Sequence, residues 1–269
     1  MTHRTLLPTL LFALMLGGVP TAVVDAQERR GIFGRERDPV ERLEELNPPY
    51  DGRFQFVRLR FDAAGGRGGF GFGRRQPPWM HDYPRAERNF MRILDETTTM
   101  TPWVEASHIL SVGDPELFRH PVAYIVEVGF WDPTDEEAAS LGAYLRKGGF
   151  LIVDDFRSER ELQRFRYQID RVLPGAQLIR LDDSHEIFDS FFHIESLENI
   201  VPPTFQQLPP IFYGIYEEND PQERLLAIVN FNNDIAEYWE FSDRGYYPID
   251  LSNEAYKLGV NYVVYAMSH

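Results

Sequence analysis

Apolar and polar positions follow two different rhythms along the middle of the chain. Residues 121–128 and 150–154 are short, nearly continuous apolar runs, which are typical of parallel strands buried on both faces. Between them, residues 134–145 repeat apolar side chains every three or four positions, as an amphipathic helix does. This alternation extends from residue 103 to residue 181 and predicts an open, mostly parallel sheet with helices on both faces.

The same two rhythms predict the remaining elements. Strands are expected within residues 54–61, 103–112 and 177–181, and a hairpin is expected from residues 211–217 and 224–231. Helices are expected at residues 84–98, after a Thr134–Glu137 capping box, after a Ser158–Glu161 capping box and after a Ser252 cap. The predicted fold class is therefore α/β, with a C-terminal hairpin and helix.

The composition limits the number of domains and excludes several chemistries. The chain has 269 residues, 43% of them hydrophobic, which suffices for one sizeable α/β domain or two small ones; we expect a single domain at residues 51–269. It has no cysteine, so disulfides, thiolate metal ligands and a cysteine nucleophile are excluded. The formal net charge of -15 argues against a nucleic-acid partner, because phosphate contacts need a basic surface.

Residues 1–26 have the pattern of an export signal. Arg4 gives a positive start, residues 6–19 are mostly apolar, and small or permissive residues precede a predicted cleavage after Ala26. The apolar stretch is too short for a comfortable membrane span. We therefore expect a periplasmic or secreted protein with no integral membrane span after cleavage; an uncleaved anchor is the alternative.

The segment after this signal is basic, although the chain as a whole is acidic. Residues 27–75 carry 11 Arg against 8 acidic residues, whereas residues 76–269 carry 15 Lys and Arg against 33 acidic residues. We interpret residues 27–50 as a charged linker and residues 65–75 as an Arg/Gly-rich loop. The G-x-G-x-x-G spacing in that loop is not followed by the helix that a dinucleotide site requires. The basic segment is either a solvated tail or a contact for anionic lipid or envelope polymer.

Two adjacent acidic residues stand where a predicted strand ends. Asp154 and Asp155 complete the apolar run that begins at Phe150, and ligands of open α/β sheets bind beyond the carboxyl ends of the strands. Adjacent strand residues point to opposite faces, so one of the two is expected to face a crevice. The alternative role is a helix cap, which Ser158 and Glu161 already supply.

A histidine and a carboxylate follow the next predicted strand. Asp183 and His185 lie in LDDSHEIF, and a carboxylate beside an imidazole can complete a metal site. If a divalent metal is bound, Asp155, Asp183 and His185 are its candidate ligands; no other cofactor is predicted. The alternative is a loop whose Asp or Ser caps a short helix.

Further ligand candidates lie at two other strand or helix ends. Asn233 and Asp234 end the second hairpin strand in NFNND, where a polar strand end with turns is the alternative. Asp82 precedes the first helix together with Pro84, a position that helix capping alone can explain.

An ordered set of motifs resembles a known bacterial family. The motifs are RLRF, HDYPRAERNF, ELFRHPVAYIVEVG, LRKGGFLIVDDF, LDDSHEIF, VNFNNDIAEYWE and YKLGVNYVVYA. Over residues 53–267 this order is similar to that of the family labelled domain of unknown function 4159. The resemblance implies a class I glutamine amidotransferase-like three-layer sandwich. In amidotransferases of that fold a strand resembling FLIVDDF ends in a cysteine nucleophile, whereas this chain has Asp154 and Asp155 there, so cysteine-based glutaminase chemistry is excluded.

Two classes of function fit these observations. A non-catalytic module that binds a small ligand or an envelope protein at a degenerate amidotransferase-like site is favoured, because the chain lacks that nucleophile and the common hydrolase and nucleotide motifs. The alternative is a carboxylate- or metal-dependent hydrolase of a sugar or cell-envelope component. In that case Asp155, Asp183 and His185 would be metal ligands or acid–base groups, with Asp82 and Asp234 at the rim.

Overall fold

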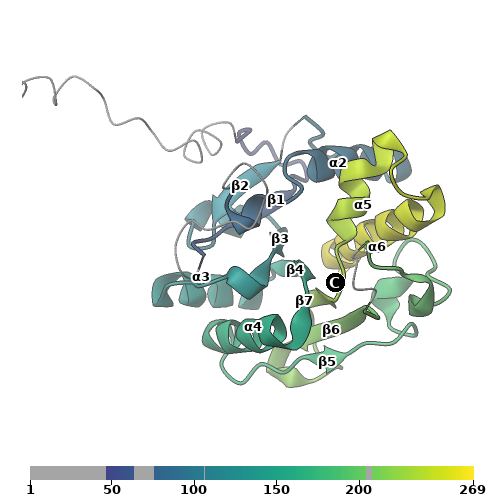
Figure 1. Cartoon of the computed structure of the whole chain (residues 1–269). Coiled ribbons are helices and arrows are strands. Elements are labelled where there is room, and N and C mark those ends of the chain that lie inside the picture. The colour runs from purple at the N-terminus through teal and green to yellow at the C-terminus, as the bar shows by residue number, and fades with distance from the viewer. Residues whose placement is uncertain (1–46, 64–75, 106, 204–207) are drawn as a thin grey trace, which may run out of the picture. The chain divides into compact units, whose positions relative to one another are not determined.

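Seven strands form a single sheet in the order β2-β1-β3-β4-β7-β6-β5 (Figure 1). The computed structural model describes residues 47–63, 76–105, 107–203 and 208–269, all within the compact unit Pro39–His269. The strands are β1 (Val57–Arg60), β2 (His108–Ser111), β3 (Val122–Val126), β4 (Phe150–Phe156), β5 (Ile179–Arg180), β6 (Ile211–Tyr216) and β7 (Leu225–Phe231). Strands β2, β1, β3, β4 and β7 are parallel, and β6 is antiparallel to β7 and β5. The predicted mostly parallel α/β sheet is confirmed.

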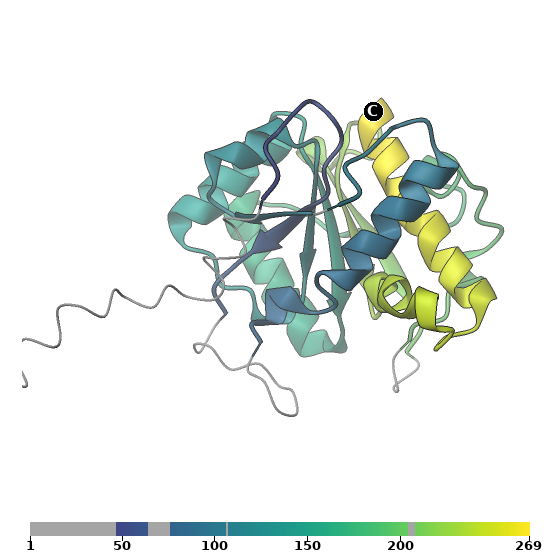
Figure 2. The ribbon, with the colours of Figure 1, turned by 90° about the horizontal axis from the view of Figure 1, so that it is seen from above.

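Helices cover both faces of the sheet and complete three layers (Figure 2). They are α2 (Arg85–Thr97), α3 (Asp135–Arg146), α4 (Ser158–Val172), α5 (Ile235–Phe241) and α6 (Ile249–Ser268). The sheet has one hydrophobic core on each face, and alternate residues of β4 belong to different cores. Ile152 packs in the core that contains α2, α5 and α6, whereas Leu151 and Val153 pack in the core that contains α3 and α4. Because both faces of the central strands are buried, their sequences are continuous apolar runs.

The predicted C-terminal hairpin is present and belongs to the main sheet. Strand β7 lies beside β4 in parallel, with Val229 level with Val153, and β6 returns along its other side. Since parallel neighbours end at the same edge of a sheet, the hairpin brings the polar end of β7 next to the polar end of β4.

The helix starts agree with the predicted caps only in part. Thr134 and Glu137 form the expected reciprocal capping box at α3. At α4 the Glu161 carboxylate instead accepts from the Arg157 N–H at 2.7 Å, while the Ser158 hydroxyl accepts from the Glu161 N–H at 3.4 Å.

Two other helix predictions need correction. The predicted Ser252 cap is wrong, because α6 already begins at Ile249 after Pro248, and the Ser252 hydroxyl donates to the Pro248 carbonyl within the first turn. Helix α5 was not predicted, because its seven residues are too few to show a periodic apolar stripe.

Several predicted segments lie outside the described residues: the signal peptide (1–26), most of the linker (27–46) and the Arg/Gly-rich loop (65–75). The described part of the linker contacts the domain directly. The Asn47 side chain donates to the Ile109 carbonyl at 2.8 Å and accepts from the Ile109 N–H at 2.9 Å, which pairs it with the edge strand β2. Within the described ranges, no helix has the length and apolar character needed to cross a membrane.

Two histidines are buried together near this edge. The His108 and His120 rings lie 4.7 Å apart between centroids, and both side chains are almost inaccessible. Among the described residues, neither ring nitrogen of His120 has a hydrogen-bond partner. Burial, with the neighbouring charges of His108 and Arg119, lowers the pKa of His120 to about 4. His120 is therefore neutral in the folded protein under conditions in which the unfolded chain already protonates it.

This difference predicts a loss of stability in mild acid. Between the unfolded pKa of 6.5 and the folded pKa of about 4, the unfolded state binds a proton that the folded state does not, so the free energy of unfolding falls as the pH falls. We expect this residue to contribute a loss of about 2 kcal/mol between pH 7 and pH 4.5. Urea denaturation at both pH values should show a smaller loss in His120→Phe than in the wild type. His193→Gln, which changes an exposed histidine, is the control; equal losses in all three proteins would contradict the prediction.

Candidate functional site

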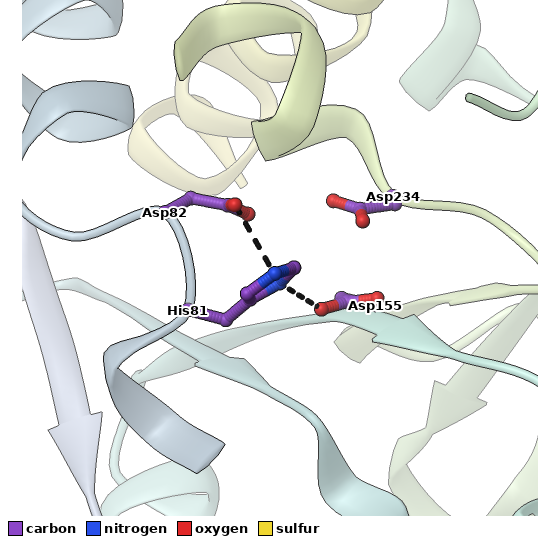
Figure 3. Close-up of side chains that lie close together, drawn as sticks. All are labelled: His81, Asp82, Asp155 and Asp234. Atoms are coloured by element: carbon purple, nitrogen blue, oxygen red, sulfur yellow. Dashed lines mark hydrogen bonds and ion pairs between the residues drawn. The ribbon is translucent and has the colours of Figure 1, made fainter. Parts of the chain in front are cut away.

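Four polar side chains meet at the carboxyl edge of the sheet (Figure 3). His81 and Asp82 come from the turn before α2, Asp155 from the end of β4 and Asp234 from the residue before α5. One nitrogen or carboxylate oxygen of each residue lies within 4.8 Å of those of the other three. The three aspartates are buried and His81 is exposed. Polar groups from separate strand ends thus converge at the edge where open α/β sheets bind their ligands.

A β-bulge at the end of β4 gives its two aspartates different surroundings. The pairing with β7 shifts between Val153 and Phe156, so that Asp154 and Asp155 together stand opposite Asn230. Asp155 has a φ of 50°, in the left-handed region that residues with a side chain rarely adopt. The two adjacent carboxylates consequently have separate sets of partners.

Asp154 connects the sheet to α5. Its carboxylate accepts hydrogen bonds from the Tyr124 hydroxyl at 2.8 Å, from the Ile235 N–H at 2.9 Å and from the Asn230 amide at 3.2 Å. Complete burial raises the pKa of Asp154 to about 6, against the opposing effect of the hydrogen bonds from Tyr124 and Asn230. Asp154 therefore holds the first turn of α5 in place and is not available to a ligand.

Asp155 lies between two positive groups. It accepts from His81 Nδ1 at 2.6 Å and from the Arg157 guanidinium at 2.6 Å. Burial disfavours its charge, but the hydrogen bond and charge of His81 and the charge of Arg157 outweigh burial and lower the pKa of Asp155. Burial likewise opposes the charge of His81, yet the contact with Asp155 raises the pKa of His81 to about 10. At neutral pH the two residues are an imidazolium–carboxylate pair.

A buried arginine positions the turn that carries His81 and Asp82. Arg58 of β1 donates to the carbonyl oxygens of Trp79 at 3.1 Å and His81 at 2.9 Å. Its guanidinium is paired with the buried carboxylate of Glu87 in α2. Because these contacts join β1, the turn and α2, the direction of the turn is determined by the domain core.

Asp82 is a buried carboxylate without an N–H or hydroxyl donor. The residue is 7% exposed, and no N–H or hydroxyl donor among the described residues reaches either carboxylate oxygen; the Glu240 carboxyl lies close enough to share a proton with it. The nearest ionic contact is His81 Nδ1, 3.5 Å from Asp82 Oδ1 (Figure 3). Burial and the negative charges of Asp155 and Glu237 raise the pKa of Asp82 well above its usual value. Buried carboxylates normally have hydrogen-bond donors or a cation, so the exception at this position calls for an explanation.

Asp234 has both a structural and an electrostatic role. Its carboxylate caps α5 by accepting from the Glu237 N–H at 3.1 Å, and it accepts from the Arg157 guanidinium at 3.2 Å. Burial and the charges of Asp155 and Asp82 nevertheless raise its pKa well above the usual value. The preceding Asn233 is fully buried, and neither polar atom of its side chain has a partner among the described residues.

Part of the backbone strain of the domain lies at the same edge, although Thr101, Glu218 and Asn219 elsewhere in the fold also have positive φ values. Positive φ values occur at Asp82 (62°), Glu127 (52°), Asp155 (50°) and Asn232 (57°). Glu127 directly follows β3 and donates its N–H to the Asp155 carbonyl at 3.1 Å. Burial and the charge of Asp155 raise the pKa of Glu127 to about 8. Such strained residues persist where surrounding contacts require them, and they are frequent at binding and catalytic sites.

We call the group formed by His81, Asp82, Asp155 and Asp234 the carboxyl-edge cluster. It contains three of the predicted site residues: Asp82, Asp155 and Asp234. Two others, Asp154 and Asn233, are sequence neighbours of cluster members but do not belong to it. Asp183 is exposed on the loop after β5. His185 bonds the Tyr216 hydroxyl at 2.8 Å, where β6 pairs with the first residue of β7. That contact lies at the opposite edge of the sheet.

The three candidate metal ligands are therefore not brought together. Asp155 belongs to the carboxyl-edge cluster, whereas Asp183 and His185 belong to the loop beyond β5. The physical reason is that β5 ends after only two residues and the chain turns back along the sheet. A strand end predicted from sequence does not show where the following loop runs.

Two acidic residues of α5 also lie beside the cluster, and the sequence pattern did not predict them as site residues. Glu237 and Glu240 follow Asp234 at spacings of three and six residues, which places all three on one side of α5. Glu237 and Glu240 form a second acidic group with Asp82, in which one carboxylate oxygen of each residue lies within 4.8 Å of those of the other two. The spacing of these acidic residues can be read in DIAEYWE, but it places them on one side of an element only if that segment is helical.

A comparison with protein families places the chain in one of them. The model of a domain of unknown function, DUF4159, matches residues 56–267. The chain belongs to this family. The match spans β1 to the last turn of α6, so it contains every residue of the carboxyl-edge cluster. No curated protein matches the chain. The relationship of this DUF4159 domain to the class I glutamine amidotransferase-like superfamily stays a prediction.

The contacts of Asp154 predict a structural role that can be measured. In Asp154→Asn an amide would replace the carboxylate that accepts from Tyr124, Ile235 and Asn230, leaving at least one buried donor without an acceptor. We expect a loss of about 1–3 kcal/mol in the free energy of unfolding at pH 7.5. Asp183→Asn makes the same chemical change on the surface and should stay within about 0.5 kcal/mol of the wild type. Denaturant unfolding measures both; equal stability of the two variants would contradict the assignment.

Proposed function

We propose that this DUF4159 domain binds a divalent cation at the carboxyl edge of its sheet, with Asp82, Asp155 and Asp234 as ligands. His81 becomes a fourth ligand only when the cation displaces the proton that the imidazole carries at neutral pH. The observation that carries the proposal is the buried carboxylate of Asp82, whose two oxygens have no N–H or hydroxyl donor within the described residues. The nearest positive group, His81, lies 3.5 Å from Asp82 Oδ1 and is hydrogen-bonded to Asp155, so a cation would supply Asp82 with a direct positive partner.

The charge balance of the cluster supports the same conclusion. Of the three buried carboxylates, Arg157 contacts those of Asp155 and Asp234. His81 and Arg58 also attract the charge of Asp82, but His81 is paired with Asp155 and Arg58 with Glu87. A divalent ion among these carboxylates would offset their mutual repulsion, which these side-chain cations only partly relieve.

The donor set indicates which ions to test. Carboxylate oxygens suit Mg²⁺, Ca²⁺ and Mn²⁺, and the addition of one imidazole favours Mn²⁺ or Zn²⁺. Each carboxylate oxygen has two lone pairs, so the oxygens of Asp155 and Asp234 that accept from Arg157 can still coordinate an ion. We therefore expect Mn²⁺ or Zn²⁺ to bind more tightly than Mg²⁺.

Replacement of Asp82 should weaken cation binding and strengthen the fold. Isothermal titration of the full chain with Mn²⁺, Zn²⁺, Mg²⁺ and Ca²⁺ should show binding that Asp82→Asn weakens at least tenfold. Without cation, the same variant should be more stable than the wild type by about 1 kcal/mol, because it removes a buried carboxyl group whose ionisation is disfavoured by burial and by the charges of Asp155 and Glu237. An ion at 100 times its Kd should add about 2.7 kcal/mol to the wild type.

Asp183→Asn serves as the matched control, because it removes an acidic residue outside the cluster and should leave binding unchanged. If none of the four ions bound, or if Asp82→Asn and Asp183→Asn bound them equally well, the proposed site would be wrong.

A cation-dependent hydrolase is the second candidate function. The observation in its favour is His81: Asp155 holds its Nδ1, while 47% of the side chain is exposed, so the imidazole is oriented and also accessible to a substrate. The carboxylates of Asp82, Asp155 and Asp234 approach within 4.8 Å, closer than the ~5–10 Å between the paired carboxyl groups of glycosidases. This spacing favours chemistry on a metal over direct glycosidase chemistry by two carboxylates.

Turnover assays distinguish the hydrolase from a pure binding module. The cation-loaded full chain would be tested on chromogenic esters, phosphoesters and glycosides. A hydrolase should show activity that requires the cation and falls at least 100-fold in His81→Gln. Saturating cation without turnover on any of these substrates would count against the hydrolase, and cation binding alone would stand.

A further inference from the structure

The acidic residues of α5 extend the cluster beyond the first group of ligands. Asp234 caps the helix, and Glu237 and Glu240 follow at intervals of three residues. Carboxylate oxygens of Glu237, Glu240 and Asp82 lie within 4.8 Å of one another. The same limit holds for one nitrogen of His81 and one carboxylate oxygen each of Asp82, Asp155 and Asp234. Asp82 is the residue that both groups share.

The shared residue has the properties of a bridging ligand. A carboxylate has two oxygens and can bind a different cation with each. Asp82 is 7% exposed, and among the described residues neither of its oxygens has an N–H or hydroxyl donor. One cation bound through a single oxygen would leave the other buried without a partner, whereas bidentate binding would occupy both oxygens with one ion. Two cations, one at each oxygen, would also occupy both.

Packing between α2 and α5 holds the second group together. The Asn89 amide of α2 donates to the Trp239 carbonyl at 2.8 Å and to the Glu240 carbonyl at 3.4 Å, which fixes the end of α5 beside α2. Phe90 stacks on Trp239 with their ring centroids 4.4 Å apart. Asp82 stands just before α2, so these contacts determine its position relative to Glu240.

In the second group one carboxylate is held by a hydrogen bond, and the nearby Arg85 is paired with a residue outside the group. The Tyr247 hydroxyl donates to Glu237 Oε1 at 2.7 Å and so restrains that carboxylate. Arg85 lies near enough to influence Glu240, but its guanidinium is paired with Asp243 at 2.6 Å. Glu237 and Glu240 are half-buried, so an ion can reach them from solvent.

We propose that the carboxyl edge holds two divalent cations bridged by Asp82, the second of them bound by Glu237 and Glu240. This inference rests on the proposed function and extends it from one ion to two. Two metal ions in a shared site typically lie ~3.5–4 Å apart.

The number of bound ions tests this proposal with Mn²⁺ as the probe. Equilibrium dialysis of the full chain against Mn²⁺, followed by metal analysis, should give two ions per wild-type chain and one per Glu240→Gln chain. Electron paramagnetic resonance should show a spin-coupled manganese pair in the wild type and an isolated ion in Glu240→Gln. Glu195→Gln, an exposed glutamate outside the cluster, is the matched control and should retain two coupled ions.

The outcomes separate this inference from the proposed function. One ion in the wild type, unaffected by Glu240→Gln, would overturn the second site and leave the first intact. Two ions that persist in Glu240→Gln and also in Glu237→Gln would likewise overturn the assignment of these ligands. No bound ion in the wild type would overturn both proposals. If Glu240→Gln did not fold, Glu237→Gln and the wild-type spectrum would still decide the question.

Discussion

The β-bulge at the end of β4 is the constraint on which the carboxyl-edge cluster depends. It inserts one additional residue opposite Asn230 and turns Asp155 into the left-handed region. Asp154 can then accept hydrogen bonds from the first turn of α5 while Asp155 contacts His81 and Arg157. In a regular strand two consecutive side chains would point to opposite faces of the sheet. Here both carboxylates lie near the start of α5, where Asp154 accepts from the Ile235 N–H and Asp155 lies within 4.8 Å of Asp234. The bulge therefore provides both the support of the cluster and one of its members.

The other residues of the cluster are positioned by structural contacts of residues that do not belong to it. Arg58 holds the turn that carries His81 and Asp82 through two carbonyl oxygens, and its buried pairing with Glu87 joins that turn to α2. Asp154 sets the start of α5 and thus the position of Asp234. Each acidic group is consequently fixed by the core of the domain, which is how a site keeps like charges close together despite their repulsion.

The cluster is costly to the folded state. It contains buried carboxylates near one another, strained backbone at Asp82 and Asp155, and an aspartate without an N–H or hydroxyl donor among the described residues. Interactions of this kind lower stability unless another species compensates for them, and they are characteristic of positions retained for binding or catalysis. A cation is the compensating species that fits the ligands present. The absence of cysteine leaves no thiol for chemistry at the end of β4, where the chain has Asp154 and Asp155 instead.

Local sequence patterns determined the strands that are buried on both faces and the helices that are clearly amphipathic, because the spacing of apolar residues reflects which positions are buried. The runs at β3 and β4, the capping box of α3 and the placement of Asp154 and Asp155 at a strand end could all be predicted in this way. Only the tertiary structure decided that β7 lies beside β4, that α5 forms after it, and that Asp82 and His81 face Asp155 while Asp183 and His185 do not. Those facts depend on contacts between residues more than 70 positions apart, such as His81 with Asp155 and Asp154 with Ile235. Local periodicity carries no information about such pairings.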